Sequence, residues 1–189
     1  MVAAVLAAVL CSGGCFQEIA FQDDASWAYR IDVEKLDIPV LAVISRATLD
    51  RKYEIRTFWA GPQNSWEVEP GRMLDQVARV ELPQMFSRVE FAEVADDPPE
   101  NVRLVLDLEL RSYDFSEGGA NVIMKATAST KGGRVLLERT YQGRGGRDSA
   151  KEKLTAAWGM KSLLRQSSLE AFKDVFAAMR KDLVTALQP

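Results

Sequence analysis

The residues that could perform chemistry in this chain are few. Histidine is absent, which removes the commonest general base and every metal site with an imidazole ligand. Both cysteines, Cys11 and Cys15, lie close to the start of the chain, so the rest of the sequence has no thiol for nucleophilic catalysis, zinc binding or a disulfide. Acid–base chemistry would therefore depend on clusters of carboxylates, lysines or tyrosines.

One pair of carboxylates has a spacing that suits catalysis. Asp107 and Glu109 lie two residues apart in a run of alternating apolar and polar residues, so both side chains leave the same face of the predicted strand. Arg103 and Arg111 share that face, and opposite charges along one strand face favour a ladder of surface ion pairs. We interpret the two carboxylates as members of such a ladder and predict no catalytic role for them.

Two further patterns resemble ligand sites. Glu93, Asp96 and Asp97 form an acidic group, but two prolines follow and no glycine-centred calcium loop is present, so a solvated turn is expected. The glycine-rich segment 143–147 lies between a predicted strand and a predicted helix, yet Asp148 stands where a dinucleotide-binding loop has its third glycine. We predict a flexible connection there, and no catalytic residue, metal or cofactor anywhere in the chain.

Charge is unevenly distributed along the sequence. The net charge is -3, from 24 Lys and Arg against 27 Asp and Glu, which argues against a globally basic nucleic-acid-binding protein. Residues 90–117 carry nine acidic residues and two arginines, whereas residues 134–165 carry eight basic residues and three acidic ones. The basic segment predicts docking to a charged partner or to anionic lipid head groups, with Arg144 and Arg147 as candidate contacts. The alternative is charge pairing between strands of the sheet.

The start of the chain predicts a secretory signal. Residues 2–10 are uninterrupted small or aliphatic residues, which would span about 14 Å as a helix, roughly half of a bilayer core. This run is too short for a transmembrane anchor and has the length of the hydrophobic region of a signal peptide. An ordinary cleaved signal without lipid and a buried N-terminal helix are the alternatives to a lipoprotein signal.

The segment Ser12–Cys15 resembles the lipobox of bacterial lipoproteins, in which a cysteine after small residues is acylated and becomes the first residue of the mature chain. The two glycines before Cys15 match the small positions at the cleavage site, whereas bulky Leu10 makes Cys11 the poorer candidate. We therefore predict lipid attachment at Cys15, with palmitate among the acyl chains. Several acyl chains are needed for stable binding to a membrane, and the modified lipoprotein cysteine supplies them.

The lipobox divides the chain into three parts. Residues 1–14 are the predicted lipoprotein signal peptide, residues 15–26 a lipidated tether, and residues 27–189 a single α+β periplasmic domain. Phe16, rather than an aspartate, follows the cysteine, which in Gram-negative lipoproteins favours the outer membrane. The predicted location is therefore the periplasmic face of the outer membrane.

The domain is predicted to be a sheet covered by helices. Strict alternation at Val102–Leu110 predicts a half-buried central strand whose apolar face meets the C-terminal helix. Gly132 and Gly133 predict a hairpin between the last two strands. Further strands are expected at residues 27–33, 38–47, 52–59, 89–95, 121–131 and 134–142. The predicted fold class is α+β, with a mostly antiparallel sheet of about five to six strands and two main helices packed on one face.

Prolines and capping residues delimit the helices. Pro70 suits the first turn of a helix, and Pro83 should end or kink that helix because it has no backbone donor. The Ser-x-x-Glu pattern of a capping box occurs at Ser149–Glu152 and at Ser167–Glu170. These boxes predict a short basic helix at 149–157 and a last helix after it.

Short motifs along the domain carry a likeness to a known family. They are Tyr29–Ile31, Ile38–Val40, Leu49–Arg51, Tyr53, Ile55–Arg56, Trp59, the Pro-led helix with Leu74 and Leu82, and Phe86–Val89. With these motifs, the long alternating strand and the lipobox, the chain resembles the ABC-type transport auxiliary lipoprotein family, which includes the outer-membrane lipoprotein of paraquat-inducible lipid-transport systems. Its outline is also similar to the lipopolysaccharide-assembly lipoprotein. Residues 61–69 and the helix at 149–157 are departures from the family pattern.

The resemblance implies a non-catalytic accessory lipoprotein of an ABC-driven lipid or envelope transport system, which acts by docking to a periplasmic partner. A structural or secretion-associated lipoprotein, such as a pilotin-like or pilus-assembly accessory, is the second hypothesis. An enzyme is the third, and the lack of a nucleophile–base pair argues against it. Neighbouring genes for a permease, an ATPase and a lipid-shuttle substrate-binding domain would favour transport.

Overall fold

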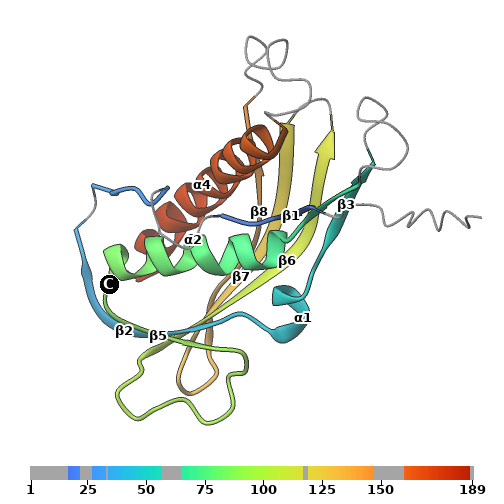
Figure 1. The fold of residues 1–189 in the computed structure, drawn as a ribbon. Helices are drawn as coiled ribbons and strands as arrows, with labels where there is room; N and C mark the ends of the chain where they lie inside the picture. Colours follow the sequence, from blue (N-terminus) through green and yellow to red (C-terminus); the bar gives the residue numbers. More distant parts are fainter. Residues whose placement is uncertain are drawn as a thin grey trace, which may run out of the picture.

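The computed structural model describes residues 17–21, 27–32, 34–56, 65–116, 119–146 and 160–187. The signal peptide, Cys11, Cys15, Arg147 and the short helix expected at 149–157 lie outside the described residues. Figure 1 shows the described part as a twisted sheet with two long helices lying on it.

A five-stranded sheet forms the main layer of the fold (Figure 1). Its strands, in spatial order, are β5 (Phe86–Ala92), β2 (Leu36–Val43), β6 (Leu104–Ser116), β7 (Gly119–Thr130) and β8 (Val135–Arg144). β2 runs parallel to both β5 and β6, whereas β7 runs antiparallel to β6 and β8. The sheet is therefore mixed.

The prediction of a mostly antiparallel sheet is wrong, because the pairings of β2 with β5 and with β6 are both parallel. Alternation of side chains shows which face of a sheet a residue occupies, and this alternation is the same in parallel and antiparallel sheets. It therefore carries no information about strand direction. Here the chain leaves β2 and returns to β5 through a helix, which is the long crossover that parallel strands need.

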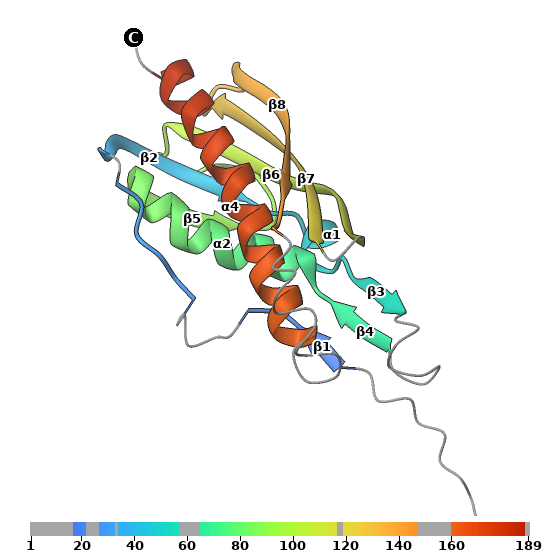
Figure 2. The same cartoon turned by 90° about the horizontal axis from the view of Figure 1, so that it is seen from above.

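A second, smaller sheet lies at one end of the molecule (Figure 2). It contains β1 (Gln17–Ile19), β4 (Ser65–Val68) and β3 (Tyr53–Arg56), with β4 in the centre. β1 runs parallel to β4, and β3 runs antiparallel to it. The strand expected at 52–59 is thus confirmed over the residues of β3, and 57–59 lie outside the described residues. Residues 15–26, which the sequence assigned to a tether, include β1.

Three predicted strands differ from the structure, and one of them, expected at residues 89–95, lies at Phe86–Ala92 (β5). Residues 27–32 have no regular secondary structure. The run 38–47 forms β2 only as far as Val43, after which Arg46–Leu49 form the short helix α1. The Ser45 side chain caps this helix because its hydroxyl oxygen accepts a backbone N–H of the first turn at 3.3 Å.

Helix α2 (Pro70–Met85) begins with a proline at its first position, as predicted. Pro83 does not stop the helix, which continues to Met85 and ends where the Phe86 N–H bonds to the Leu82 carbonyl oxygen. Pro83 is exposed and lies in the last turn of the helix.

Helix α4 (Met160–Leu187) begins before the second predicted capping box. Ser167 lies in the helix interior and is 1% exposed, so it does not cap the helix. Its Oγ accepts the Ala120 N–H of β7 at 2.8 Å, and Glu170 accepts the Gly146 N–H beyond β8 at 2.7 Å. The Ser-x-x-Glu pattern therefore satisfies backbone donors of the sheet instead of those at a helix end.

β6 is the central strand of the main sheet, as predicted. Its apolar side chains Leu104, Leu106, Leu108 and Leu110 are at most 1% exposed. α2 packs on β5 and β6, and α4 packs on β7 and β8, so the two helices cover one face and share one core (Figure 2). The helix nearest to the backbone of β6 is therefore α2, whereas the sequence had placed the C-terminal helix there.

A β-bulge at Arg111 changes which side chains of β6 are buried. In the pairing with β7, Leu110 and Ser112 face successive residues, which leaves Arg111 as an extra residue. The side chains that enter the core beneath the helices occupy even-numbered positions from Leu104 to Leu110 and then continue at Tyr113. The strand thus runs on past the point where the sequence alternation ends.

Candidate functional site

The first described residues are built directly into the fold. β1 pairs with β4 from Gln17 onward, and Ile19 is fully buried. The Glu69 N–H, between β4 and α2, donates to the Ile19 carbonyl oxygen at 3.0 Å. Gln17 is two residues after Cys15, and a chain reach of about 3.5 Å per residue keeps Cys15 within about 7 Å of β1.

Beyond β1 the chain lies on α2 as an extended strap, which we define as residues 20–21 and 27–32. Gln76 of α2 holds its first part. The side-chain amide accepts the Phe21 N–H at 3.2 Å and donates to the Phe21 carbonyl oxygen at 3.4 Å. The Phe21 side chain is buried in the core shared by the two helices.

Gln84, about two turns further along α2, holds the second part of the strap. It accepts the Ile31 N–H at 2.9 Å and donates to the Tyr29 carbonyl oxygen at 3.0 Å. Each glutamine amide thus offers an extended backbone the donor and acceptor that a neighbouring strand would offer. This explains why residues 27–32 are extended although they belong to neither sheet.

A buried ion pair joins α2 to α4 beneath the strap. Arg180 Nη1 donates to Glu81 Oε2 at 3.0 Å, and the Glu81 side chain is 1% exposed. Tyr29 of the strap donates to the other oxygen of Glu81 at 2.5 Å, and Lys173 Nζ lies 3.9 Å from the centre of the Tyr29 ring. Burial, and next the hydrogen bond to Glu81, raise the pKa of Tyr29. The phenol therefore stays protonated and serves as a hydrogen-bond donor.

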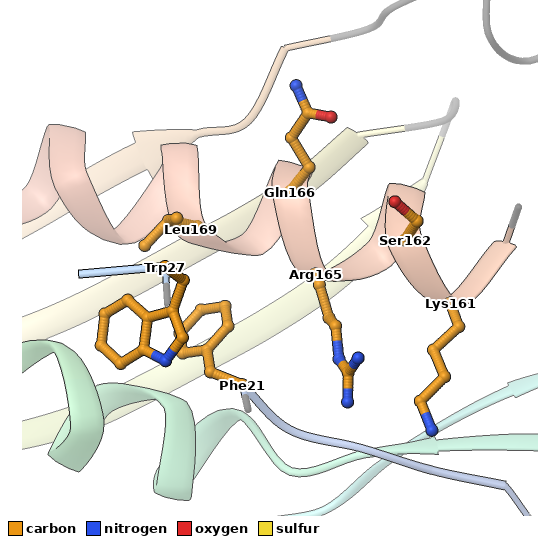
Figure 3. Close-up of a pocket in the computed structure, with 7 residues that line it drawn as sticks. All are labelled: Phe21, Trp27, Lys161, Ser162, Arg165, Gln166 and Leu169. Atoms are coloured by element: carbon orange, nitrogen blue, oxygen red, sulfur yellow. The ribbon is translucent and has the colours of Figure 1, made fainter. Parts of the chain in front are cut away.

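A pocket of about 510 Å³ opens between the strap and the first turns of α4 (Figure 3). The residues that line it are Phe21, Trp27, Lys161, Ser162, Arg165, Gln166 and Leu169. A pocket of this size and mixed lining suits a small ligand or the head group of a lipid.

The pocket has an aromatic side and a cationic side. The rings of Phe21 and Trp27 lie 4.8 Å apart between centroids. Lys161 and Arg165 extend from the same side of α4 toward the segment that precedes Phe21 (Figure 3), and Arg165 Nε donates to the Ala20 carbonyl oxygen at 2.7 Å. Such an arrangement can hold a negatively charged group beside an apolar one.

The lining residues offer contacts for binding and include neither a carboxylate nor an imidazole that could act as a general base. Within the part of the chain that the structure describes, no three His, Cys, Asp or Glu side chains are grouped so that they could hold a metal ion. The lining therefore offers contacts to charged and to apolar groups.

The predicted ion-pair ladder lies on the face of the sheet away from the two long helices. Arg111 Nη2 lies 2.9 Å from Glu109 Oε2. Lys125 of β7 stands opposite Glu109 and forms an ion pair with Glu138 of β8. Partial burial, and next the charge of Glu109, raise the pKa of Asp107. The ladder is therefore confirmed only for Glu109 and Arg111, because Asp107 and Arg103 form no ion pair with any residue that the structure describes.

The acidic group after β5 lies in an exposed bend, as expected of a solvated turn. Glu93, Asp96 and Asp97 are all exposed, and Glu93 Oε1 lies 3.5 Å from Arg46 Nη1. Asp97 has a φ of 51°, a left-handed conformation that aspartate tolerates in turns. These side chains form part of a surface turn.

The glycine-rich segment packs tightly against α4 from Gly143 to Gly146. The prediction of a flexible connection is therefore wrong for these residues. A Cβ atom on Gly145 would lie 1.9 Å from the Ser167 carbonyl oxygen, and one on Gly143 would lie 2.0 Å from that of Ala171. Glycine at these two positions lets the end of β8 reach the backbone of α4.

Of the two arginines proposed as docking contacts, the structure describes only Arg144. Arg144 is exposed at the last position of β8, next to the glycines that pack on the first half of α4. Arg147 lies outside the described residues. Arg144 therefore lies near the first half of the helix that carries Lys161, whereas Arg139, nearer to the hairpin, forms an ion pair with Asp182 near the end of that helix.

The sequence interpretation missed the strap, the pocket and the buried ion pair. Glu81 falls three residues after Ala78 on the apolar face of α2, and Arg180 falls four residues after Phe176 on the apolar face of α4. One charged residue on each of two apolar helix faces is the signal that could have indicated the pair. The glutamines that hold the strap have no comparable signal, because an amide can pair with any extended backbone.

No helix within the described ranges combines the length and the apolar composition that crossing a membrane requires.

We compared the chain with family models, curated proteins and solved structures, and a match was found only among the solved structures. No model of a known protein family matches the chain, and no curated protein matches it. Among solved structures, the crystal structure of a Xanthomonas campestris protein of family DUF330 is similar, with a TM-score of 0.46 and 13% sequence identity. The match covers 88% of this chain and 96% of that chain. A likeness of this size establishes neither the fold nor the function.

Proposed function

We propose that this chain is a lipid-anchored protein of the bacterial envelope that acts by binding, as an accessory of an ABC-driven lipid or envelope transport system. The observation that carries the proposal is the short connection between Cys15 and the fold. β1 begins at Gln17, and Ile19 is already fully buried. A body joined so closely to an acylated cysteine stays at the membrane surface instead of moving on a long tether.

Two further observations support binding rather than catalysis. The pocket beside the strap is lined by cationic, aromatic and neutral polar side chains. The buried group formed by Tyr29, Glu81 and Arg180 has a protonated phenol and a carboxylate that is closed off from solvent. Both arrangements suit recognition and packing. The assignment to lipid transport rests on the lipobox and on the family resemblance of the sequence.

Mass spectrometry of the protein extracted from membranes tests the proposed anchor. The mature chain should begin at Cys15 and carry a lipid adduct. Cys15→Ala should release the protein from the membrane fraction or misplace it, because the acyl chains supply the membrane affinity.

Cys11→Ala is the matched control and should leave the protein in the membrane fraction. Recovery of an unmodified soluble mature chain from wild-type cells would refute the anchor.

A further inference from the structure

Chain length limits how far the folded body can stand from an acylated Cys15. Gln17 follows Cys15 by two residues, and Ala20 follows it by five. At about 3.5 Å per residue, Ala20 lies at most about 18 Å from Cys15. Arg165 bonds to the carbonyl oxygen of Ala20 at 2.7 Å, so the first turns of α4 are held at the same end of the molecule.

The rest of α4 extends away from that end (Figure 2). Lys181 lies on the same helix, twenty residues after Lys161, which is about 30 Å along the helix axis. An acyl anchor two residues before β1 therefore brings Lys161 toward the bilayer and leaves Lys181 remote from it.

The side chains at the near end match the chemistry of a phospholipid surface. Arg165 presents a planar fork of donors that suits phosphate, and Lys161 adds a point charge. Trp27, half-buried against Phe21, is the residue type that favours the level where head groups meet acyl chains. Cations and aromatic rings thus occur together on the side where the anchor holds the membrane.

We infer that the pocket formed by Phe21, Trp27, Lys161 and Arg165 is a phospholipid head-group site, which fixes the body on the membrane with the start of α4 at the bilayer surface. This inference rests on the proposed acylation of Cys15. The occupant is the phosphate group of a phospholipid in the leaflet that holds the anchor.

An intramolecular ion pair is the competing explanation for the two cations. Asp23 and Asp24 follow Phe21 in the sequence and precede Trp27. If these carboxylates were the partners of Lys161, the lysine would be shielded whether or not phospholipid is present. A lysine that binds a head group is shielded only on the phospholipid membrane.

Labelling of lysines in the full acylated chain separates the two explanations. The protein is held in micelles of a nonionic detergent or inserted into preformed vesicles of equal parts phosphatidylglycerol and phosphatidylcholine. A small amine-acetylating reagent is added, and modification of Lys161 and Lys181 is followed by mass spectrometry. Lys181, exposed on the same helix, is the internal control.

We expect the labelling rate of Lys161 to fall about fivefold on the vesicles, the factor that corresponds to about 1 kcal/mol for one lysine at an anionic surface. Labelling of Lys181 should not change. About 1 M salt, at which the Debye length is about 3 Å, should restore most of the Lys161 rate.

Three results would overturn the inference: equal Lys161 rates in micelles and vesicles, slow Lys161 labelling in both, or stronger protection of Lys181. The mass of the N-terminal peptide, taken from the same sample, separates this failure from failure of the proposed anchor. An acylated peptide with a reactive Lys161 refutes the orientation alone. An unmodified peptide refutes the anchor and the orientation together.

Discussion

At the scale of the residue, neighbouring side chains of β6 have opposite surroundings. Leu106 is fully buried, so Leu106→Ala should lower the free energy of unfolding by about 2–5 kcal/mol, because it deletes methyl groups and leaves a cavity. Asp107 lies on the exposed face of β6 with its side chain only partly shielded from water, and Asp107→Ala should change that free energy by less than about 1 kcal/mol. Urea unfolding measures both. Similar losses for the two variants would show that the faces of β6 are assigned wrongly.

The charge of Asp107 should make a small contribution to the free energy of unfolding, and this contribution should depend on pH. Partial burial and the charge of Glu109 raise the pKa of Asp107 in the folded protein, so the folded state holds this proton more tightly than the unfolded state. The free energy of unfolding therefore falls as the pH rises from the ordinary pKa of aspartate through the raised pKa of Asp107 in the folded protein. This loss of stability persists at neutral pH.

Asp107→Asn should consequently be slightly more stable than the wild type at neutral pH, and the gain should disappear below the ordinary pKa of aspartate. Urea unfolding at several pH values measures this difference. A gain that persists at low pH would assign the effect to packing instead of charge.

At the scale of the element, the strap depends on two glutamines. Gln84→Ala removes the partners of the Ile31 N–H and the Tyr29 carbonyl oxygen, and should speed hydrogen exchange in residues 27–32. Gln142→Ala, on an exposed position of β8, is the matched control and should leave that exchange unchanged. If exchange in the strap is the same in both variants, the apolar contacts of the strap suffice to hold it.

The stability of the packing between α2 and α4 should depend on the Glu81–Arg180 ion pair. Arg180→Ala leaves the Glu81 carboxylate buried without its cation, and should lower the free energy of unfolding by about 3–5 kcal/mol. Replacing both residues by leucine should recover much of the loss.

Arg46→Ala, which breaks an exposed pair with Asp50, is the control and should change stability by less than about 1 kcal/mol. Urea unfolding of the wild type and the three variants measures these changes. A double-leucine variant as unstable as Arg180→Ala would mean that lost packing, rather than the buried charge, is responsible.

At the scale of the whole molecule, Arg144 and Arg147 are the predicted docking contacts for a charged partner. Arg144→Glu combined with Arg147→Glu should weaken co-purification of a periplasmic partner, because charged patches mainly steer encounter. The remaining association should be less sensitive to salt, and the melting temperature should change little. Lys131→Glu combined with Arg134→Glu makes the same charge change at the hairpin and should have no effect on the partner. Equal behaviour of the two double variants would make the Arg144 region an ordinary solvated surface.

Local patterns in the sequence were enough to predict the central strand, the β7–β8 hairpin and the start of α2. Alternation at Leu104–Leu110 reports burial on one face, and this burial does not depend on what the neighbouring strand is. Gly133 adopts a φ of 83°, which the hairpin turn requires and glycine supplies readily. A proline in the first helical turn is favourable in any fold. Each of these signals acts within a few residues.

The sequence by itself determined the chemical limits of this protein: no imidazole, no thiol beyond Cys15, and a short apolar start followed by a lipobox-like segment. Only the tertiary structure decided the parallel pairings of β2, the small sheet that contains β1, the strap and the pocket at Lys161 and Arg165. Pairing direction, glutamine-to-backbone hydrogen bonds and a pocket between segments some 140 residues apart all depend on contacts distant in the chain, as the Arg165–Ala20 bond with its separation of 145 shows. Such contacts leave no periodicity in the local sequence, because each involves only one or two residues of either segment.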